Sequence, residues 1–381
     1  MPSEFMRLAL DEARGALGTT SPNPSVGAVV VRDGRVVGRG RTQPPGSAHA
    51  EVMALREAGA AAGGATLYCT LEPCVHTGRT GPCTEAIIEA GVRTVRYSIV
   101  DPDAQVAGAG DARLRAAGLD VEAGDGAAES ARLLEGYLKH RRTGLPAVTV
   151  KVAMSLDGRI AAASGDARWV SGPEAREWVH RLRMQVDAIV VGSGTLVADD
   201  PALTARPGGT AEGAHQPVRI VVDSRARTQP SARLFSEPGG PVIVATVEGM
   251  PAAWRAAVEA RGGEVLVLPG ETGPDGDTHV DLEALFRALG QRGMLNGMVE
   301  GGGVLLGALF DRHLVDRLYA VIAPVVVGAA SAPSAVSGRG AQVMREASRL
   351  RDLSVTRLGE DVLVEGVPVW PDATTGQRDG K

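Results

Sequence analysis

The chain has 381 residues, of which 44% are hydrophobic and 22% are charged, and its formal net charge is −5. This length exceeds the size at which single hydrophobic cores stop growing, so it predicts two domains in a globular protein. Mild acidity and only 3% aromatic residues argue against a nucleic-acid surface, which needs basic grooves and stacking side chains. No apolar run has the length of a membrane span, so neither nucleic acid nor membrane is an expected partner.

The first 146 residues alternate between helical and strand patterns. In chain order, the expected elements are a helix at 3–17, a hairpin at 26–40 that turns at Asp33-Gly34, a helix from about Glu51, a strand at 65–71, a helix at 84–90, a strand at 92–100 and a helical stretch at 127–142. This alternation predicts an α/β domain over residues 1–146, in which helices flank a sheet.

The second domain is expected from residue 147 to residue 371, because Pro146 precedes a new apolar strand at 147–153. Its further strands are expected at 186–191, 218–223, 241–246, 264–268, 297–300 and 315–327, with helices at 173–184 and 281–289. Strands that alternate with helices again predict an α/β fold. The polar tail, residues 372–381, is expected to be disordered.

Four residues of the first half predict a catalytic zinc site. His49-Ala50-Glu51 stands where a polar loop gives way to a helical pattern, and Cys74 and Cys83 each directly follow a proline. One imidazole and two thiolates make three protein ligands, which leaves the fourth tetrahedral position open, as in catalytic zinc sites. The His-x-Glu and later Pro-Cys signature belongs to zinc deaminases, in which the glutamate transfers protons without binding the metal. Glu51 fits that role.

The alternative is that these cysteines are buried hydrophobic thiols and that His49 is a histidine at the end of a helix. Two Pro-Cys pairs downstream of a His-x-Glu, in a chain with only three cysteines, favour zinc. The third cysteine, Cys69, lies in an expected strand and is predicted to pack in the core. The odd, low count and the lack of a secretory signal argue against disulfides and favour a reducing, cytoplasmic location.

The second half has two glycine-rich turns after apolar strands, Gly192-Ser193-Gly194-Thr195 and Glu300-Gly301-Gly302-Gly303. Glycines there would let the backbone approach the phosphates of a dinucleotide, although such turns are often only turns. Neither matches the Rossmann fingerprint. Lys151 stands inside an apolar strand, so its cation needs a partner or a pocket.

Longer segments resemble the bifunctional riboflavin-biosynthesis deaminase/reductase family over roughly residues 3 to 370. In the first half they are Ser21-Pro22-Asn23-Pro24-Ser25-Val26-Gly27, the His49-Ala50-Glu51 motif and the run from Thr70 to Cys83. In the second half they are the run from Lys151 to Ile160, Trp169, Ala198-Asp199-Asp200-Pro201 and Glu300-Gly301-Gly302. Eight residues separate Cys74 from Cys83, against two in ordinary cytidine deaminases, which makes the resemblance specific.

The resemblance implies a cytidine-deaminase-like three-layer domain followed by a dihydrofolate-reductase-like α/β domain. It implies a two-step enzyme that uses Zn²⁺ and NADPH and forms a homo-oligomer, a dimer or a tetramer. The substrate would be a small pyrimidine ribosyl phosphate, 2,5-diamino-6-ribosylamino-4(3H)-pyrimidinone 5′-phosphate. The first domain would hydrolyse a ring amino group, and the second would reduce the ribosyl chain to give 5-amino-6-ribitylamino-uracil 5′-phosphate.

The resemblance also implies roles for individual residues. Zinc would be bound by His49, Cys74 and Cys83, with Glu51 as the proton carrier, and the deaminase substrate would contact Asn23 and His76. Lys151 would stand near the hydride-transfer region. The sugar phosphate would be held by Arg183, Leu203, Arg206 and Glu300. The NADPH site would be lined by Ala153, Trp169, Thr195, Asp199, Ser224, Gly301, Gly302 and Gly303.

Two positions depart from the family pattern. Ala167 stands where the family often has a substrate-contacting serine, and Asp103 lies in Asp101-Pro102-Asp103-Ala104, which replaces the more usual Asp-Pro-Asn-Pro. Arg225 is a candidate for the 2′-phosphate of NADPH, but it reads equally well as a surface arginine. Two other functions remain: a zinc deaminase whose second domain binds nucleotide without catalysis, and a nucleotide-sensing module that has lost catalysis.

Overall fold

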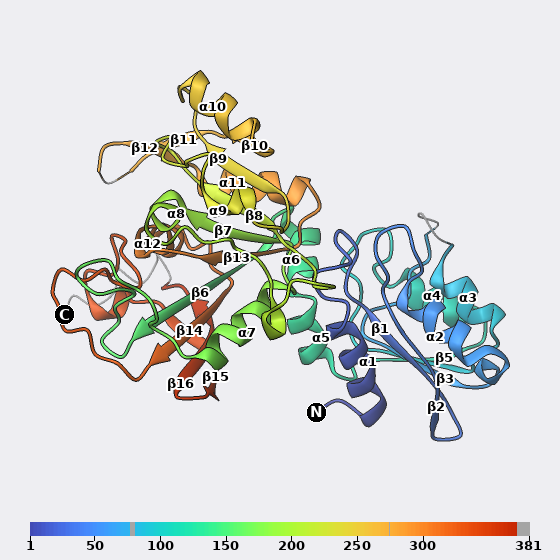
Figure 1. The fold of residues 1–381 in the computed structure, drawn as a ribbon. Helices are drawn as coiled ribbons and strands as arrows, with labels where there is room; N and C mark the ends of the chain where they lie inside the picture. The colour runs from blue at the N-terminus through green and yellow to red at the C-terminus, as the bar shows by residue number, and fades with distance from the viewer. Residues whose placement is uncertain (77–80, 274, 372–381) are drawn as a thin grey trace, which may run out of the picture. The chain divides into compact units, whose positions relative to one another are not determined.

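The computed structural model describes residues 1–76, 81–273 and 275–371 of the chain. The chain divides into two compact units (Figure 1), which we describe separately. Unit 1 contains Met1–Pro146 and Gly290–Leu295, and unit 2 contains Ala147–Leu289 and the chain from Asn296 onward. The tail at 372–381, expected to be disordered, lies outside the described residues.

Unit 1 is built on a five-stranded sheet. Its strands, in spatial order, are β2 (Arg35–Arg41), β1 (Gly27–Arg32), β3 (Thr66–Cys69), β4 (Thr94–Tyr97) and β5 (Asp120–Ala123). The β1–β2 hairpin turns at Asp33 and Gly34, both at positive φ, as an Asp-Gly turn prefers. β1 also pairs antiparallel with β3, whereas β3, β4 and β5 run parallel.

Helices cover both faces of this sheet and make the unit three-layered. They are α1 (Glu4–Arg14), α2 (Ala50–Ala58), α3 (Cys83–Glu89), α4 (Ala109–Ala116), α5 (Ala127–Leu133) and α6 (Glu135–Thr143). Alternate side chains of β1 point to opposite faces: Val29 packs in the cluster that contains α1, and Val30 packs in the cluster that contains α2, α3 and α4. Cys69 is fully buried in the second cluster, so the structure places it in the core.

Two glycines of β2 allow α2 to lie close against the sheet. A Cβ at Gly40 would stand 2.2 Å from the Ala50 carbonyl oxygen, and one at Gly38 would stand 2.1 Å from that of Ala54. Both distances are far below van der Waals contact, so these positions need glycine. The close packing fixes α2, whose start carries His49 and Glu51.

A buried carboxylate, Glu72, organises the segment from Asp101 to Asp111. Glu72 is 2% exposed and accepts four backbone N–H bonds, from Asp101 (3.2 Å), Gly108 (3.0 Å), Gly110 (2.9 Å) and Asp111 (3.1 Å). A Cβ at Gly110 would stand 2.1 Å from the Pro73 carbonyl oxygen. The first turn of α4 therefore packs directly behind the Pro73-Cys74 turn.

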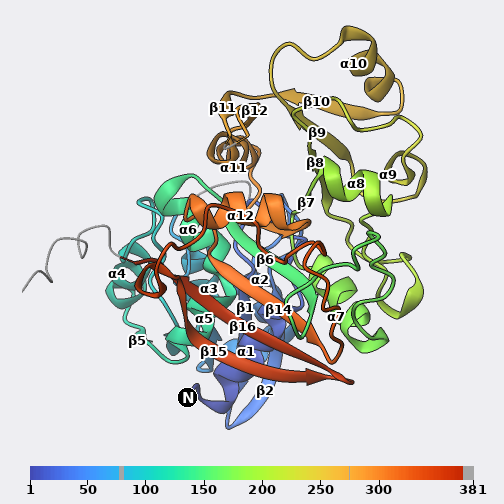
Figure 2. The same cartoon turned by 90° about the vertical axis from the view of Figure 1, so that its left-hand side faces the viewer.

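Unit 2 is built on a nine-stranded sheet; Figure 2 shows four of its strands, β6, β14, β16 and β15, side by side. In spatial order the strands are β10 (Gly263–Val267), β9 (Val242–Thr246), β8 (Val218–Val222), β7 (Ala188–Gly192), β13 (Asn296–Glu300), β6 (Ala147–Ser155), β14 (Arg317–Ala323), β16 (Asp361–Val369) and β15 (Arg349–Leu358). All neighbours pair in parallel except those of β16, which pairs antiparallel with β14 and β15. β11 (Gly270–Thr272) and β12 (Thr278–Val280) form a separate hairpin.

The helices of unit 2 connect these strands. They are α7 (Pro173–Arg183), α8 (Ser193–Asp199), α9 (Arg233–Ser236), α10 (Ala252–Glu259), α11 (Leu282–Gln291) and α12 (Gly303–Asp311). β13 lies between β7 and β6. The strands that follow β7 in the chain, β8 to β10, extend the sheet on one side of β13, whereas β14 to β16 extend it on the other side, so the strand order reverses at this point. In open α/β sheets ligands bind beyond the carboxyl ends of the strands at such a reversal, which is where Thr195 and Glu300 lie.

The sequence patterns missed several elements. α4 and β5 lie in a stretch rich in Gly, Ala and charge, where no periodicity stood out, and the helix expected at 127–142 is interrupted at Leu134. β15 was missed because most of its residues are exposed, so it lacks alternation. The strand expected at 315–327 ends at Ala323.

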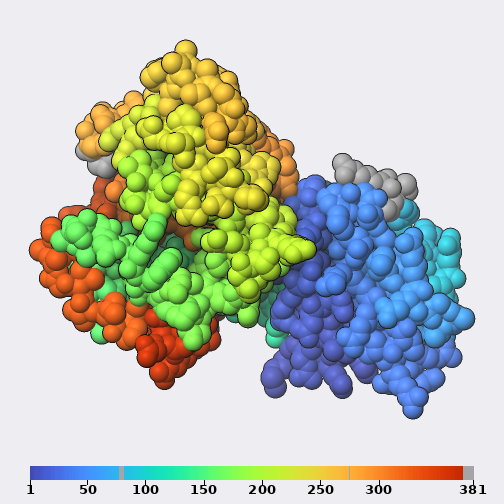
Figure 3. Space-filling view, viewed as in Figure 1, coloured from blue at the N-terminus to red at the C-terminus, as the bar shows by residue number. Residues whose placement is uncertain are grey.

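The surface of unit 2 includes the chain that follows α8, yellow-green in the space-filling view (Figure 3). Arg206, Gly208 and Gly209 in this segment are exposed. Among the helices of the described residues, none combines the length and apolar character needed to cross a bilayer.

We predict that Glu72→Gln lowers the free energy of unfolding of unit 1 by about 2 to 4 kcal/mol, because the amide nitrogen would face two buried N–H donors. Chemical denaturation followed by circular dichroism measures this change. Glu122→Gln, at an exposed carboxylate of the same unit, is the matched control. Equal stability of the two variants would show that the four hydrogen bonds of Glu72 contribute little.

Candidate functional site

Three side chains of unit 1 form a cluster suited to zinc. His49 directly precedes α2, Cys83 is the first residue of α3, and Cys74 follows the turn behind which α4 packs. Their ligand atoms all lie within 4.8 Å of one another. His49 Nδ1 stands 3.6 Å from Cys74 Sγ and 3.3 Å from Cys83 Sγ. Tetrahedral zinc with ordinary Zn–S and Zn–N bonds separates such atoms by about 3.5 Å, so the three residues fit the metal.

Hydrogen bonds and burial within the cluster shift the pKa values of its three groups in different directions. Hydrogen bonds from Cys83 and from His49 lower the pKa of Cys74, although burial opposes them. The same contact with Cys74, together with burial, raises the pKa of Cys83. The hydrogen bond to Cys74 raises the pKa of His49. Metal binding requires both thiols to be deprotonated and the imidazole to be neutral, so zinc binding would release protons from these groups.

Glu51 lies beside the cluster in the first turn of α2 and is 4% exposed. Burial, together with the neighbouring Cys74 charge, raises the pKa of Glu51 to about 7. A carboxyl with a pKa near neutrality both accepts and donates protons at physiological pH. Its side chain also contacts Cys83, so the carboxyl group stands next to the ligands.

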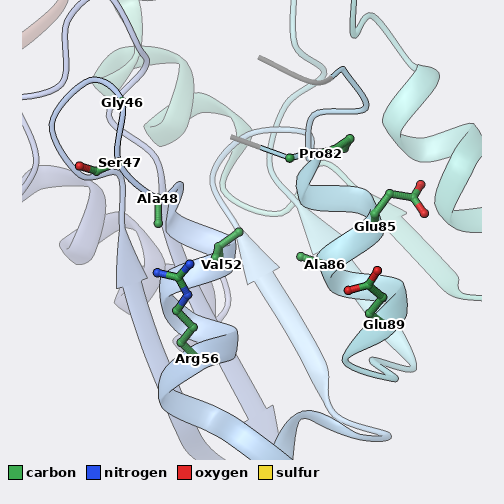
Figure 4. A pocket seen from close by; sticks show the side chains of 10 residues that line it. Gly46, Ser47, Ala48, Val52, Arg56, Pro82, Glu85, Ala86 and Glu89 are labelled. Atoms are coloured by element: carbon green, nitrogen blue, oxygen red, sulfur yellow. The ribbon is translucent and has the colours of Figure 1, made fainter. Parts of the chain in front are cut away.

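A groove of about 650 Å³ runs between α2 and α3 (Figure 4). One end is formed by Ala48 and Pro82, which directly precede the ligands His49 and Cys83. The full lining is Gly46, Ser47, Ala48, Val52, Arg56, Gly81, Pro82, Glu85, Ala86 and Glu89. The groove therefore lies next to residues that adjoin the zinc ligands in the chain.

The two residues expected to contact the deaminase substrate are both partly buried. His76 follows Cys74 by two residues, and its Nδ1 is a buried atom without a hydrogen-bond partner among the described residues. An unpartnered buried polar atom two residues from a metal ligand suits a ligand contact. Asn23 lies in the turn before β1, where its backbone N–H donates to Thr20 O. The substrate contacts of both residues remain predictions.

In unit 2 the structure brings together Lys151, Arg183 and Glu300. Glu300, the last residue of β13, stands directly opposite Lys151 in the parallel register of β13 and β6. Arg183 closes the cluster with two bonds to Glu300, from Nε at 2.7 Å and from Nη2 at 3.0 Å. Burial raises the pKa of Glu300, but the charges of Arg183 and Lys151 lower it overall. Burial lowers the pKa of Lys151.

The two glycine-rich turns meet at Thr195. The Gly302 N–H donates to Thr195 Oγ1 at 2.9 Å, and a Cβ at Gly301 or Gly302 would meet nothing closer than 3.5 Å. Gly303 differs, because its Cβ would stand 2.2 Å from Ser334 O. Gly301 and Gly302 thus leave room for a ligand, whereas Gly303 lets the chain at Ser334 pack on α12.

The other residues expected to line the NADPH site lie on several elements. Trp169 is 71% exposed, and Arg176 lies over its ring at 4.5 Å from the centroid. Asp199 ends α8, and burial raises the pKa of its carboxyl group. Ser224 follows β8 and accepts from Val280 N–H at 3.0 Å. Ala153, partly buried, lies on β6 two residues beyond Lys151.

The segment after α8 carries Leu203 and Arg206. Arg183 Nη1 donates to Thr204 O at 2.9 Å, so the arginine that binds Glu300 also holds this segment. Leu203 is 3% exposed and has a positive φ of 52°. The guanidinium group of Arg206 is exposed and forms no ion pair with any described residue. Of the two arginines, Arg206 therefore keeps its charge available.

The departures from the family pattern have local structural roles. Ala167 has no side-chain donor, and its carbonyl accepts from Val170 N–H at 3.0 Å. The Asp103 carboxylate accepts from Gln105 N–H at 3.0 Å and lies 3.5 Å from Arg141 Nε. Arg225 forms ion pairs with Asp275 and Asp277, which favours its reading as a surface arginine.

Comparisons with known proteins match both halves of the chain. The family described as cytidine and deoxycytidylate deaminase zinc-binding region matches residues 1–99, and the RibD C-terminal domain matches residues 146–364. The riboflavin biosynthesis protein RibD of Escherichia coli is 41% identical over 94% of this chain and 97% of its own length. The chain belongs to the RibD family. It is a bifunctional deaminase/reductase with a zinc-binding deaminase domain and an NADPH-dependent reductase domain.

Other RibD proteins show the same similarity. The RibD of Mycobacterium tuberculosis (strain H37Rv) is 41% identical over 95% of this chain and 96% of its own length. The structure of Acinetobacter baumannii RibD matches with a TM-score of 0.83 and 34% identity, covering 96% of this chain and 98% of its own. The Thermotoga maritima diaminohydroxyphosphoribosylaminopyrimidine deaminase/5-amino-6-(5-phosphoribosylamino)uracil reductase matches with a TM-score of 0.82 and 31% identity, with the same coverage. These matches confirm the expected fold class and do not favour a deaminase whose second domain lacks catalysis.

Sequence reasoning missed several residues that hold the sites in place. Glu72 lies in the run from Thr70 to Cys83, but the sequence pattern assigned no role to it. Asp157, in the run from Lys151 to Ile160, is only a functional-looking polar group in the sequence; its carboxylate accepts from Val327 N–H (3.0 Å) and Gly328 N–H (2.8 Å) and so fixes a distant loop. His180 precedes Arg183 by one helical turn, and that spacing was the only available signal.

We predict that Cys74→Ala and Cys83→Ala each lose stoichiometric zinc, because two protein ligands hold the metal far more weakly than three. Cys69→Ala, which removes the buried core thiol, should keep it. Metal analysis of the purified variants after dialysis against a chelator measures the difference. Zinc retained at full stoichiometry by both ligand variants would contradict the three-ligand site.

Proposed function

We propose that this chain deaminates 2,5-diamino-6-ribosylamino-4(3H)-pyrimidinone 5′-phosphate and then reduces the product to 5-amino-6-ribitylamino-uracil 5′-phosphate. We assign the first step to residues 1–146 and the second to residues 147–371. The proposal rests on two clusters that the same chain contains. In unit 1 the buried carboxyl group of Glu51 lies beside the three zinc ligands, and in unit 2 Lys151, Arg183 and Glu300 lie together. Family membership supports the same pair of activities.

In the deamination, water replaces the ring amino group, which leaves as ammonia. Zinc, held by His49, Cys74 and Cys83, supplies Lewis-acid activation when bound. Glu51 takes a proton from the attacking water and returns one to the leaving amine, which a carboxyl with a pKa of about 7 is suited to do. His76, with its unpartnered Nδ1, and Asn23 hold the substrate.

In the reduction, NADPH supplies the hydride. Lys151 is a cation beside the reacting carbon, and the Glu300 carboxylate opposite it accepts hydrogen bonds from sugar hydroxyls. Arg206 binds the phosphate with its available charge, while Arg183 holds Glu300 and the backbone beside Leu203. The cofactor lies along Ala153, Trp169, Thr195, Asp199, Ser224 and the glycines Gly301, Gly302 and Gly303.

We also infer a homo-oligomer, a dimer or a tetramer, in the cytoplasm. The edge strand β15 exposes Leu353 (59%) and Val355 (63%), and an exposed apolar edge is available for pairing with a second copy. Zinc thiolates favour a reducing compartment. Light scattering of the purified chain tests the oligomer, and a monomeric mass at micromolar concentration would contradict it.

The proposed function is tested by supplying the diaminopyrimidinone ribosylamino phosphate and NADPH together. Ammonia release and NADPH oxidation are followed in one reaction, with Cys74→Ser alongside. Both signals should appear with the wild type, and both should vanish in the variant, because reduction depends on deaminated product. Ammonia without NADPH oxidation would leave only the deaminase, and neither signal from zinc-loaded protein would reject the proposal.

We predict that Glu51→Gln slows ammonia release by about 10² to 10⁴-fold while zinc stays bound, because the amide cannot transfer the proton. Ammonia assays and metal analysis of the same sample measure both effects. Glu57→Gln, at an exposed position of α2, is the control and should keep the wild-type rate. Near wild-type turnover by Glu51→Gln would exclude the proton-carrier role.

We predict that Lys151→Met slows reduction of the deaminated intermediate by about 10²-fold, because a positioned charge at the reacting atoms is lost. Ammonia release by the same variant should be unchanged and serves as the internal control. NADPH oxidation with pre-deaminated substrate measures the first effect. Equal loss of both activities would argue against separate sites.

A further inference from the structure

One face of α7 binds the backbone of the segment that carries Arg206. Glu177, His180 and Arg183 follow one another at intervals of three residues, so their side chains lie on one face of the helix. The Glu177 carboxylate accepts from Gly208 N–H at 3.0 and 3.1 Å, His180 Nδ1 accepts from Arg206 N–H at 3.2 Å, and Arg183 donates to Thr204 O at 2.9 Å. Three side chains on one face of α7 thus bind the backbone of residues 208, 206 and 204.

The contacts of His180 define which of its nitrogens carries the proton. His180 Nδ1 is 3.2 Å from both Arg206 N and Thr204 O. Thr204 O already accepts from Arg183, whereas the Arg206 N–H needs an acceptor. Nδ1 therefore offers its lone pair, and Nε2 carries the hydrogen. Burial lowers the pKa of His180, and the Arg183 and Arg206 charges lower it further, against the Thr204 carbonyl and Glu300, which raise it.

The same segment is held from its other side. Gln216 forms two bonds with Ala205, since its Oε1 accepts from the backbone N–H at 3.0 Å and its Nε2 donates to the carbonyl at 2.8 Å. Arg219 donates to Ala202 O at 3.2 Å. The backbone is thus fixed on both sides of Arg206, while the Arg206 side chain stays exposed. A binding group that is ordered in advance loses less entropy when its ligand arrives.

We propose that His180 is a positioning residue for phosphate recognition in the reductase, because its Nδ1 fixes the Arg206 backbone and so directs the Arg206 guanidinium toward the sugar phosphate. This inference rests on the proposed role of Arg206. It deepens that role, since His180 then determines how strongly the reductase prefers phosphorylated over unphosphorylated substrate. His180 itself touches neither substrate nor cofactor.

The test uses the full-length, zinc-loaded chain and three variants, His180→Ala, His180→Asn and Arg206→Gln. NADPH oxidation is measured with the deaminated ribosylamino phosphate and with its dephosphorylated counterpart. His180→Ala should raise the KM for the phosphorylated substrate about tenfold, which is the effect of one lost hydrogen bond of ordinary strength. Its kcat, its KM for NADPH and its kcat/KM for the dephosphorylated substrate should stay within about twofold of wild type.

His180→Asn is the rescue variant, because Asn Oδ1 can take the place of Nδ1 as the acceptor for Arg206 N–H. It should bring the KM back to within about threefold of the wild-type value. Glu174→Ala, at an exposed position of the same helix, is the matched control and should leave all constants unchanged. A merely structural role of His180 would lower kcat and both values of kcat/KM together.

The outcomes separate this inference from the proposed function on which it rests. If Arg206→Gln leaves the KM for the phosphorylated substrate unchanged, Arg206 does not bind the phosphate and the proposed role itself fails. If Arg206→Gln raises that KM while His180→Ala does not, the positioning role of His180 is overturned. Equal losses in His180→Ala and His180→Asn would also overturn it, since the acceptor would then not matter.

Discussion

Charged side chains removed from water need partners, and this constraint shapes both units of the protein. Glu72 is matched by four backbone N–H groups, which fix the segment behind Cys74. Arg219, 5% exposed, donates to the carbonyl oxygens of residues 202, 237 and 240. In each case a single buried charge gathers backbone from several parts of the chain, so compensating that charge also fixes the segments that carry functional residues.

The functional clusters are the places where this compensation is incomplete. His49, Cys74 and Cys83 bring three ligand atoms within 4.8 Å of one another, which suits a cation. Arg183 is paired with Glu300, and the exposed Arg206 adds a positive charge that forms no ion pair with any described residue. The positive charge of Arg206 in unit 2 suits the phosphorylated substrate that we propose, whereas the histidine and the two cysteines of unit 1 suit zinc.

In each unit the backbone geometry of a few elements places the residues of the proposed site. In unit 1 the starts of α2 and α3 carry ligands, and the glycines of β2 let α2 lie close to the sheet. In unit 2 Glu300 lies at the carboxyl end of β13, and the parallel register of β13 with β6 places it opposite Lys151, in the middle of β6. α7 belongs to the proposed reductase site, because one helical face supplies both Arg183 and the side chains that hold the Arg206 backbone.

The sequence by itself predicted the three zinc ligands, a proton carrier at Glu51 and the alternation of helices and strands, because these depend on residue types at short spacing. It also marked Lys151 as a charge that needed a partner. Only the tertiary structure showed that Glu300 is that partner, that Gly303 serves packing, and that Glu72, His180 and Arg219 hold functional segments. Those contacts join residues far apart in the chain, such as Arg183 and Glu300, and no local pattern specifies them.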